Sequence, residues 1–198
     1  MSVFRQSGHT FDARFEALRP PVFLHGYFQS WRYFDGFADE LRQLLNPARF
    51  ASPATAALEA DIETALTPVM VHVRRGDYVN YPGPTRFRLL GRDYYDAARR
   101  EIEDRAQDPT YFIFSDDPTA ARALLADWPR ARYVSGLSMF EDLLLMSRCR
   151  HFITANSTFS WWAAFLGQKA DGVVTAPATW LDSSQPVIDL CPPDWLQL

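Results

Sequence analysis

From about Pro68 onward, short apolar runs alternate with segments of helical periodicity, and this alternation constrains the fold more than any other feature of the chain. Strands that alternate with helical segments form βαβ units and a parallel sheet. The sequence therefore predicts an α/β protein, a Rossmann-like parallel sheet with helices on both faces. The apolar runs are 69–73, 111–114, 132–134, 151–154 and 172–175, and the expected helices are 93–107, 118–127, 139–149 and 157–167.

Two of the expected helices have well-marked starts. Asp117 precedes Pro118, which places an N-cap acid before a proline at the first helical position. Ser138 and Glu141 have the spacing of a capping box, in which each side chain bonds a free backbone amide near the other residue. We expect helices to begin at both places.

The first 67 residues follow a different pattern. They contain one strand-like run at 22–24 and two helical segments at 34–45 and 53–66, with no regular alternation. We expect this region either to complete the sheet or to pack on its edge. The predicted division is a remnant of an acceptor-side region with linking helices over 1–67 and a Rossmann-like domain over 68–198.

Composition excludes several classes of protein. The net charge of −4 argues against a general nucleic-acid binder, so a bound anion must be held by a few placed arginines. The chain has two cysteines, Cys149 and Cys191, which are too few for a disulfide framework and are not spaced like metal ligands. We expect Cys149 to be a buried thiol. No run approaches the roughly 20 apolar residues of a transmembrane segment, and the N-terminus lacks a secretory signal. A cytoplasmic location is the expectation.

The strongest local feature is the segment from Arg74 to Asp77, which directly follows a predicted strand. Ligands of open parallel sheets bind beyond the carboxyl ends of the strands. Two guanidinium groups there can neutralise a diphosphate without a metal, and Gly76 allows a sharp turn. The alternative is a surface turn in which Arg75 pairs with Asp77. The Arg-Gly-Asp tripeptide at 75–77 also matches an adhesion motif, and we interpret this match as a coincidence because the chain is expected to be cytoplasmic.

A second anion site is expected where the strand at 151–154 gives way to a helix. Asn156 and Ser157 begin that helix, so the backbone amides of Ser157, Thr158 and Phe159 point beyond the strand end. A helix N-terminus carries partial positive charge and suits a phosphate. The alternative is that Asn156 and Ser157 only cap the helix, which is compatible with an anion site.

Four segments together resemble the α-1,2-fucosyltransferases. The first match is His72-Val73-Arg74-Arg75-Gly76-Asp77-Tyr78, which is similar to the His-x-Arg-Arg-Gly-Asp-Tyr signature of that family. The other matches, in chain order, are Gly26-Tyr27-Phe28-Gln29-Ser30, Phe114-Ser115-Asp116-Asp117 and the block from Asp142 to Trp162. The resemblance therefore extends from Gly26 to about Trp180.

The resemblance implies roles for individual residues. Arg74 and Arg75 are the implied catalytic residues, because they would stabilise the charge that grows on the diphosphate of GDP-fucose. The implied GDP-fucose-binding set is His72, Arg74, Arg75, Asp77, Asp116, Asp142, Asn156, Ser157 and Thr158. Within it, His72 and Asp142 are implied to read the guanine edge, although a structural role for Asp142 as a first-turn acid stays open. No general base is assigned, and Trp161 and Trp162 receive no catalytic role.

The implied fold is the donor-binding C-terminal half of a GT-B-like glycosyltransferase. The implied reaction transfers L-fucose from GDP-fucose to the 2-hydroxyl of a galactose-terminated glycan, with inversion, no metal and no cofactor. The chain lacks the Gly-Asn-Gln segment of that family, so most of the acceptor-side half is expected to be missing. Three alternatives follow: an enzyme completed by a second chain or by its own N-terminal region, a silent GDP-sugar-binding module, or a structural domain without nucleotide affinity.

Overall fold

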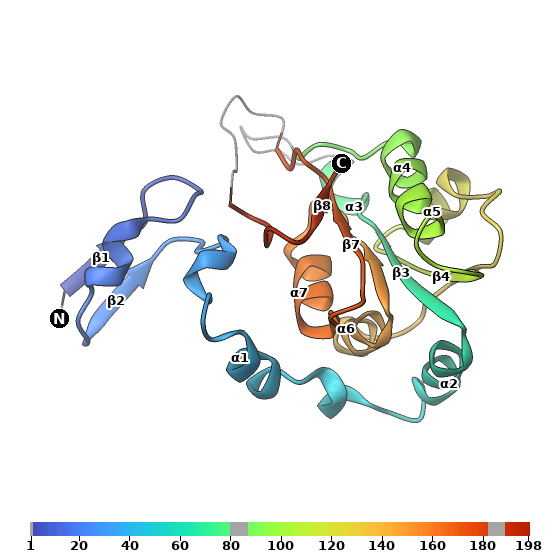
Figure 1. Ribbon diagram of the computed structural model, residues 1–198, viewed down its shortest axis with the longest axis horizontal. Helices are drawn as coiled ribbons and strands as arrows, with labels where there is room; N and C mark the ends of the chain where they lie inside the picture. The colour runs from blue at the N-terminus through green and yellow to red at the C-terminus, as the bar shows by residue number, and fades with distance from the viewer. Residues whose placement is uncertain (1, 80–86, 182–188) are drawn as a thin grey trace.

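A six-stranded parallel sheet forms the centre of the computed structural model, which describes residues 2–79, 87–181 and 189–198 (Figure 1). The strand order is β5-β4-β3-β6-β7-β8. Counted along the chain from β3, this is the order 3-2-1-4-5-6 that defines the Rossmann fold. The prediction of a Rossmann-like parallel sheet is confirmed.

The strands lie close to the predicted runs. The central strand β3, Thr67–Val73, pairs with β4, Pro109–Ser115, on one side and with β6, His151–Ile153, on the other. The outer strands are β5, Ala131–Tyr133, β7, Val174–Ala176, and β8, Leu196–Gln197. Every residue of β3 is buried, as expected of a central strand covered on both faces. Strand β8 was not predicted.

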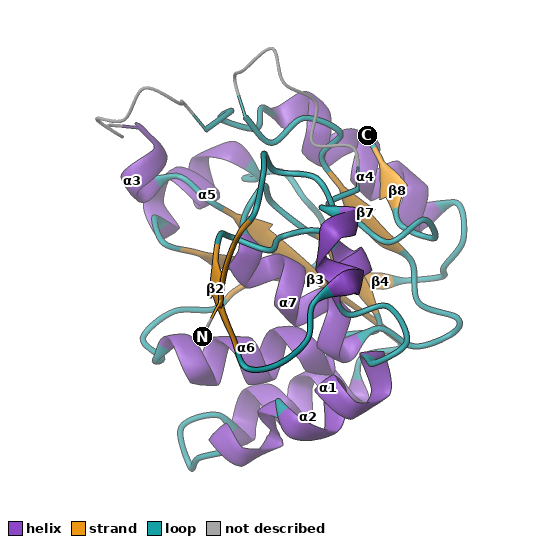
Figure 2. Cartoon of the chain, turned by 90° about the vertical axis from the view of Figure 1, so that its left-hand side faces the viewer, coloured by secondary structure: helices purple, strands orange, loops and turns teal. Residues whose placement is uncertain are grey.

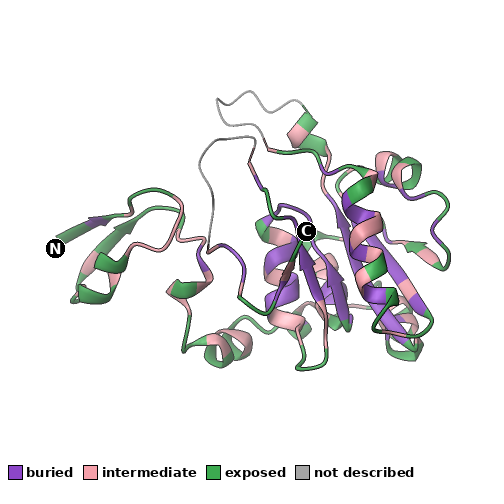
Figure 3. Ribbon diagram, turned by 45° about the horizontal axis from the view of Figure 1, so that its top comes forward, coloured by how far each residue is buried: buried purple, intermediate pink, exposed green. Residues whose placement is uncertain are grey.

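Helices cover both faces of the sheet. Helices α4, Arg92–Glu103, and α5, Pro118–Leu124, pack on one face, where Val69 and Val71 of β3 point. Helices α6, Met139–Arg148, and α7, Thr158–Gly167, pack on the other face with Met70. Figure 3 shows that the buried residues gather in the strands and in the inner sides of these helices.

Both predicted helix starts are confirmed. The Asp117 side chain accepts a hydrogen bond from the Ala120 amide at 2.9 Å, and Pro118 follows it. At α6, the Ser138 hydroxyl accepts from the Glu141 amide while the Glu141 carboxylate accepts from the Ser138 amide at 2.8 Å. The two helices that return the chain to the sheet therefore start where local side-chain chemistry fixes them.

The N-terminal region does not extend the six-stranded sheet. Strands β1, Ser2–Arg5, and β2, Val22–His25, form a separate two-stranded parallel sheet. This sheet, with the 3₁₀ turn Ala13–Ala17 between its strands, forms a β1–β2 unit that stands beyond α7 (Figures 1 and 2). The expectation that this region would complete the sheet is therefore wrong for residues 22–24, because their hydrogen-bond partner is β1.

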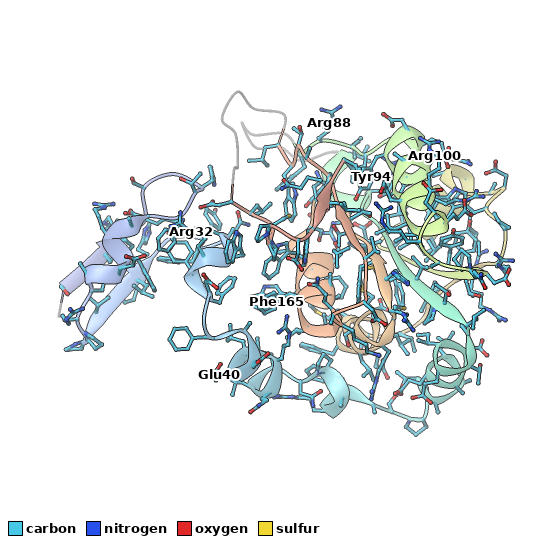
Figure 4. The ribbon with its side chains drawn as sticks, viewed as in Figure 1. Arg32, Glu40, Arg88, Tyr94, Arg100 and Phe165 are labelled. Atoms are coloured by element: carbon cyan, nitrogen blue, oxygen red, sulfur yellow. The ribbon has the colours of Figure 1, made fainter. Side chains whose placement is uncertain are left out.

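The linking helices pack on the main body. Helix α1, Ala38–Leu44, and helix α2, Ala56–Thr64, are joined by a 3₁₀ turn, Pro47–Phe50. Ile62 of α2 is 1% exposed and belongs to the core on the α6 and α7 face. Figure 4 labels Phe165 on the side of α7 toward the N-terminal segment, where its ring lies 6.1 Å from that of Phe34.

Asp189 connects the β1–β2 unit to the body. Its carboxylate accepts a hydrogen bond from the Phe11 amide at 2.9 Å, and its carbonyl accepts from the Trp31 amide at 3.3 Å. Arg32, labelled in Figure 4, lies 3.9 Å from the same carboxylate and 4.3 Å from the centre of the Phe11 ring. Polar contacts of Asp189 thus help to hold this unit against the body.

Within the described parts of the chain, we find no helix with both the length and the apolar surface that crossing a membrane requires.

Candidate functional site

The carboxyl ends of β3 and β6 form the point at which the sheet changes direction. These strands are neighbours, but the chain leaves β3 toward α4 on one face and leaves β6 toward α7 on the other. The two connections diverge and leave a crevice, which is where ligands of such sheets bind. Arg74 directly follows β3, and Asn156 to Thr158 follow β6.

A cavity of about 350 Å³ occupies this crevice. Its described lining comes from the β3 and β6 loops, the start of α7, the segment before η2 (Trp31–Tyr33) and the residues on either side of 182–188. The lining residues are Gln29, Arg74, Asp77, Tyr78, Phe87, Asn156, Ser157, Thr158, Phe159, Trp180, Leu181 and Leu190. The two loops that the sequence singled out as anion sites therefore share one cavity.

Arg74 is held by two carboxylates. Its Nη2 lies 2.9 Å from Asp77 Oδ1, and its Nε lies 3.1 Å from Asp116 Oδ2. The guanidinium carbon also lies 5.4 Å from the centre of the Tyr78 ring. Asp77 is the more exposed acid, at 57% against 23% for Asp116. A ligand that enters from solvent can therefore replace Asp77 while Asp116 still orients the guanidinium.

Arg75 points away from the cavity. Its Nη2 donates to the Leu90 carbonyl at 2.7 Å, and its backbone amide donates to Asp116 Oδ1 at 2.9 Å. Arg75 is not among the residues that line the cavity. The alternative pairing of Arg75 with Asp77 is wrong, because Asp77 pairs with Arg74.

Gly76 is required by a close approach. A Cβ atom at this position would lie 2.5 Å from Asp116 Oδ2, and Asp116 is fixed by its bonds to Arg75 and Arg74. Gly76 begins the short helix α3, Gly76–Val79, and does not have a positive φ angle. The glycine thus makes room for Asp116, whereas the sequence indicated only a sharp turn.

The start of α7 lacks a side-chain cap among the described residues. Ser157 is the N-cap residue in extended conformation, and its side chain makes no capping hydrogen bond with the described first turn. Ser157 is 6% exposed and lines the cavity with Thr158. The structure therefore differs from a helix start that is satisfied by its own cap.

Asn156 connects three segments around the cavity. Its Nδ2 donates to the Arg88 carbonyl at 2.8 Å and to the Trp180 carbonyl at 2.9 Å. Its own carbonyl accepts a hydrogen bond from the Tyr78 hydroxyl at 2.8 Å. Burial raises the pKa of Tyr78 to about 12, so that hydroxyl stays a donor at neutral pH. The Asn156 side chain is used to hold the cavity walls.

His72 lies beneath the cavity, on the α7 side of the sheet. It is 3% exposed, and its ring lies 5.9 Å from that of Phe159 in an edge-to-face arrangement. Burial, with a smaller effect of Arg74, lowers the pKa of His72 to about 3, so the imidazole is neutral. Its Nδ1 is buried and has no hydrogen-bond partner in the described structure.

Asp142, like His72, has a buried polar atom without a hydrogen-bond partner among the described residues. It lies in the first turn of α6, and its Oδ1 is buried without a partner among the described residues. Burial, reinforced by Glu141, raises the pKa of Asp142 to about 6. Buried polar atoms are rarely left unpaired in proteins, so such an atom is a place for a bound water, an ion or a ligand atom. Asp142 is not among the residues that line the cavity.

Sequence reasoning missed several residues of this cavity. Gln29 lies in a segment that carried the family resemblance but was given no role, and Tyr78 ends the arginine signature. Trp180 stood at the end of the resemblance without a role, and Leu190 had no sequence signal, because only the fold brings these two residues to the α7 start. Of the adjacent tryptophans, Trp161 is core at 4% exposure.

Metal-ligating residues do not cluster in the described ranges: no group of three or more histidine, cysteine or acidic side chains could hold a metal ion there. Both Cys149 and Cys191 are buried free thiols, as expected for Cys149. Burial raises the pKa of Cys191 to about 12, so neither a thiolate ligand nor a thiolate nucleophile is expected from it.

Comparison with known proteins gives a consistent result. The model of glycosyl transferase family 11 matches residues 4–197. An α-1,2-colitosyltransferase of Escherichia coli is 29% identical over 87% of this chain and 61% of its own length. The O-antigen biosynthesis glycosyltransferase WbnK of Escherichia coli is 41% identical over 56% of this chain and 38% of its own. A galactoside 2-α-L-fucosyltransferase of Bos taurus is 30% identical over 73% of this chain and 42% of its own.

No solved structure matches the chain significantly. The chain spans between 38% and 61% of the length of the three relatives named above.

Proposed function

Because the chain belongs to glycosyl transferase family 11, we propose that it binds GDP-fucose between the ends of β3 and β6 and serves the transfer of L-fucose to the 2-hydroxyl of a terminal galactose. Relatives from Bos taurus and Oryctolagus cuniculus that carry galactoside α-1,2-fucosyltransferase names support this choice of donor and acceptor. The observation that carries the proposal is the shared cavity of Arg74 and the α7 start.

The diphosphate would lie between Arg74 and the first turn of α7. Asp77 and Asp116 form ion pairs with the Arg74 guanidinium, and their carboxylate oxygens stand where phosphate oxygens would bind. A diphosphate displaces the exposed Asp77 and gains the backbone amides at Ser157 and Thr158. A contact between the diphosphate and Arg75 requires that its side chain leave the Leu90 carbonyl.

The chemistry follows from charge. When the C1–O bond of GDP-fucose breaks, the sugar gains oxocarbenium character and negative charge grows on the diphosphate. Arg74 and the α7 amides stabilise that growing charge, and electrostatic stabilisation of this kind usually contributes more to catalysis than any other effect. We propose transfer with inversion and without a metal, with the positive charge supplied by arginine and the helix start. No cofactor takes part.

Guanine recognition is assigned to His72 and Asp142. Both present buried atoms without partners among the described residues, and both lie on the α6 and α7 face of the sheet. A carboxylate can accept from N1–H and from the exocyclic amino group of guanine together, which distinguishes GDP from nucleotides without that donor pair. The neutral imidazole offers Nδ1 as a further hydrogen-bonding atom.

The second candidate function is a GDP-sugar-binding module without transferase activity. The observation in its favour is that the chain spans only 61% of the length of one bacterial relative and less of the others named. In that case the chain binds the nucleotide sugar without transferring the sugar to an acceptor.

One experiment separates these candidates. GDP and GDP-fucose are titrated into the protein by calorimetry, and GDP-fucose with lactose is then incubated with it, with and without EDTA. Fucosylated lactose formed equally in EDTA supports the metal-independent transferase. Nucleotide binding without product supports the binding module. Failure of GDP to bind or to raise the thermal midpoint rejects both, because a ligand of the folded state must stabilise it.

A further inference from the structure

A second cavity opens beside the first, and aromatic rings form most of its walls. Its volume is about 460 Å³, and it shares Gln29, Thr158, Trp180 and Leu190 with the first cavity. The other lining residues are Tyr27, Phe28, Phe34, Trp161 and Trp162. A ligand held by Arg74 and a ligand among these rings would therefore meet at the shared residues.

The aromatic walls are held in place before any ligand binds. Trp161 donates its indole N–H to the Leu190 carbonyl at 3.0 Å and stacks on Phe165 with ring centres 5.0 Å apart. The ring centres of Phe34 and Trp162 lie 5.4 Å apart. Figure 1 shows α7 between the sheet and the N-terminal segment, so one wall comes from the body and the other from that segment.

Trp180 supplies a polar group to this otherwise apolar cavity. Its side chain is 8% exposed, and its indole Nε1 is buried without a hydrogen-bond partner among the described residues. Its carbonyl accepts from the Asn156 amide at 2.9 Å and from the Arg88 amide at 3.2 Å, so its backbone is fixed. A fixed residue with a buried donor that the described residues leave unpaired is suited to an acceptor atom from a ligand.

Tyr27, in contrast to Trp180, is mostly exposed to solvent. It is an aromatic residue that lines the cavity and is 80% exposed. Its backbone amide donates to the Gln6 side chain at 3.1 Å, which ties this loop to the end of β1. The Tyr27 ring thus stands at the entrance of the cavity, where little of its apolar surface is covered.

We propose that this aromatic cavity binds the terminal galactose of the acceptor glycan. A pyranose ring has one face of C–H groups that packs against an aromatic ring, and a rim of hydroxyls whose oxygens accept hydrogen bonds. The aromatic walls can pack against the C–H face, and the Trp180 N–H and the Gln29 amide can donate hydrogen bonds to the hydroxyl oxygens. The assignment rests on the proposed transferase function and gives that reaction its acceptor site.

The composition of the cavity favours a neutral sugar over other occupants. None of the residues described as lining it carries a charge, so it offers nothing to a phosphate or a charged peptide. An acyl chain or an apolar side chain would leave the Trp180 N–H unpaired. A sugar hydroxyl pairs it, and it does so beside Thr158, next to the donor site.

The test is a titration of lactose into the protein, monitored by saturation-transfer NMR. It is performed once with saturating GDP and once without nucleotide. Trp180→Phe keeps a ring but removes the N–H, and Tyr27→Ala removes the entrance ring. Each variant should weaken lactose binding about five- to tenfold, the effect of one lost hydrogen bond or ring contact. The affinity of Tyr27→Ala for GDP should stay within about twofold, because Tyr27 does not line the first cavity. Trp180 lines both cavities, so Trp180→Phe is read by its lactose affinity alone.

Matched controls separate this effect from general destabilisation. Trp128→Phe makes the same chemical change on the opposite face of the sheet, and Phe23→Ala removes another exposed ring of the N-terminal segment. Both should bind lactose like the parent.

The assignment is overturned by lactose binding that is unchanged in both cavity variants, or by a parent that binds GDP but not lactose. A parent that binds lactose in a Trp180-dependent manner but does not bind GDP rejects the donor site alone. Displacement of lactose by an alkyl chain without hydroxyls, at equal concentration, also contradicts a sugar site.

Discussion

The six-stranded sheet and the β1–β2 unit are opposite kinds of structure that meet at one site. Residues of β3 such as Val69 and Met70 are fully buried, whereas Val3 of β1 and Phe23 of β2 are 56% and 53% exposed. Figure 3 shows the same contrast in colour. The donor-side residues rest on the buried framework, and the N-terminal segment adds Gln29 and the aromatic rings. Under the proposed function, nucleotide binding would depend mainly on the sheet, and acceptor binding would also need the segment packed against it.

The largest effect is expected from the sheet side. Arg74→Ala should weaken GDP binding about 100-fold or more, because it removes the guanidinium that lines the cavity and leaves Asp116 Oδ2 without its ion pair, a loss of about 3 kcal/mol. Arg74→Lys should also be severely impaired, since a point charge lacks the fork geometry. Calorimetry measures both. Arg105→Ala, an exposed arginine paired with Glu101, is the control, and GDP binding by Arg74→Ala at the parent's affinity would end the donor assignment.

The second effect is a pH dependence. The pKa of Asp142 is raised from 3.8 to about 6 in the free protein, so the carboxylate needed to accept from guanine is lost as the pH falls through that value. Below about pH 6, the affinity for GDP-fucose, whose diphosphate diester has no proton that titrates in this range, should fall by up to about tenfold per pH unit, the limit for one coupled proton. Asp142→Asn should bind weakly and should lose this dependence between pH 5 and pH 7. The same pH profile in both proteins would place guanine elsewhere.

A smaller effect is expected at Gly76. A methyl group there meets Asp116 Oδ2 at 2.5 Å, so Gly76→Ala should displace Asp116 and with it Arg74. We expect GDP affinity to fall about fivefold. If the effect passes through Asp116, Gly76→Ala in an Asp116→Ala background should cause little further loss. Additive losses in this double-mutant cycle would show that Gly76 acts by another route.

The smallest effect is expected in the β1–β2 unit. Phe23→Ser changes an exposed residue of β2 that lines neither cavity. GDP affinity should be unchanged, and the free energy of unfolding should change by less than about 0.5 kcal/mol. Denaturant unfolding and calorimetry check the two values. A clear loss of GDP affinity would break the comparison, because it would make the unit part of the donor site.

What the sequence predicted well was set by local chemistry. The Asp117 and Ser138 helix starts depend on residues three positions apart, and the strand ends that carry Arg74 and Asn156 follow directly from apolar runs. What it missed depends on distant pairing. Strand β8, Leu196–Gln197, has no pattern of its own and forms only because β7 offers an edge.

The candidate site divides in the same way. The residue types at the two loops could be predicted, but the orientation of each side chain could not. Asp77 pairs with Arg74 rather than Arg75, and Gly76 is needed because of Asp116, 40 positions further along the chain. Trp180 reaches the cavity through a hydrogen bond from Asn156, a contact that no sequence motif records.

The two carboxylates on Arg74 also set a threshold for occupancy. A guanidinium that already has its own counter-charges binds chloride or another singly charged anion weakly, because such an ion must compete with two acids at contact distance. A diphosphate competes better, since it brings several oxygens at once and reaches the α7 amides as well. Selectivity against the abundant small anions of a cell is then a property of the resting protein, present before any sugar nucleotide arrives.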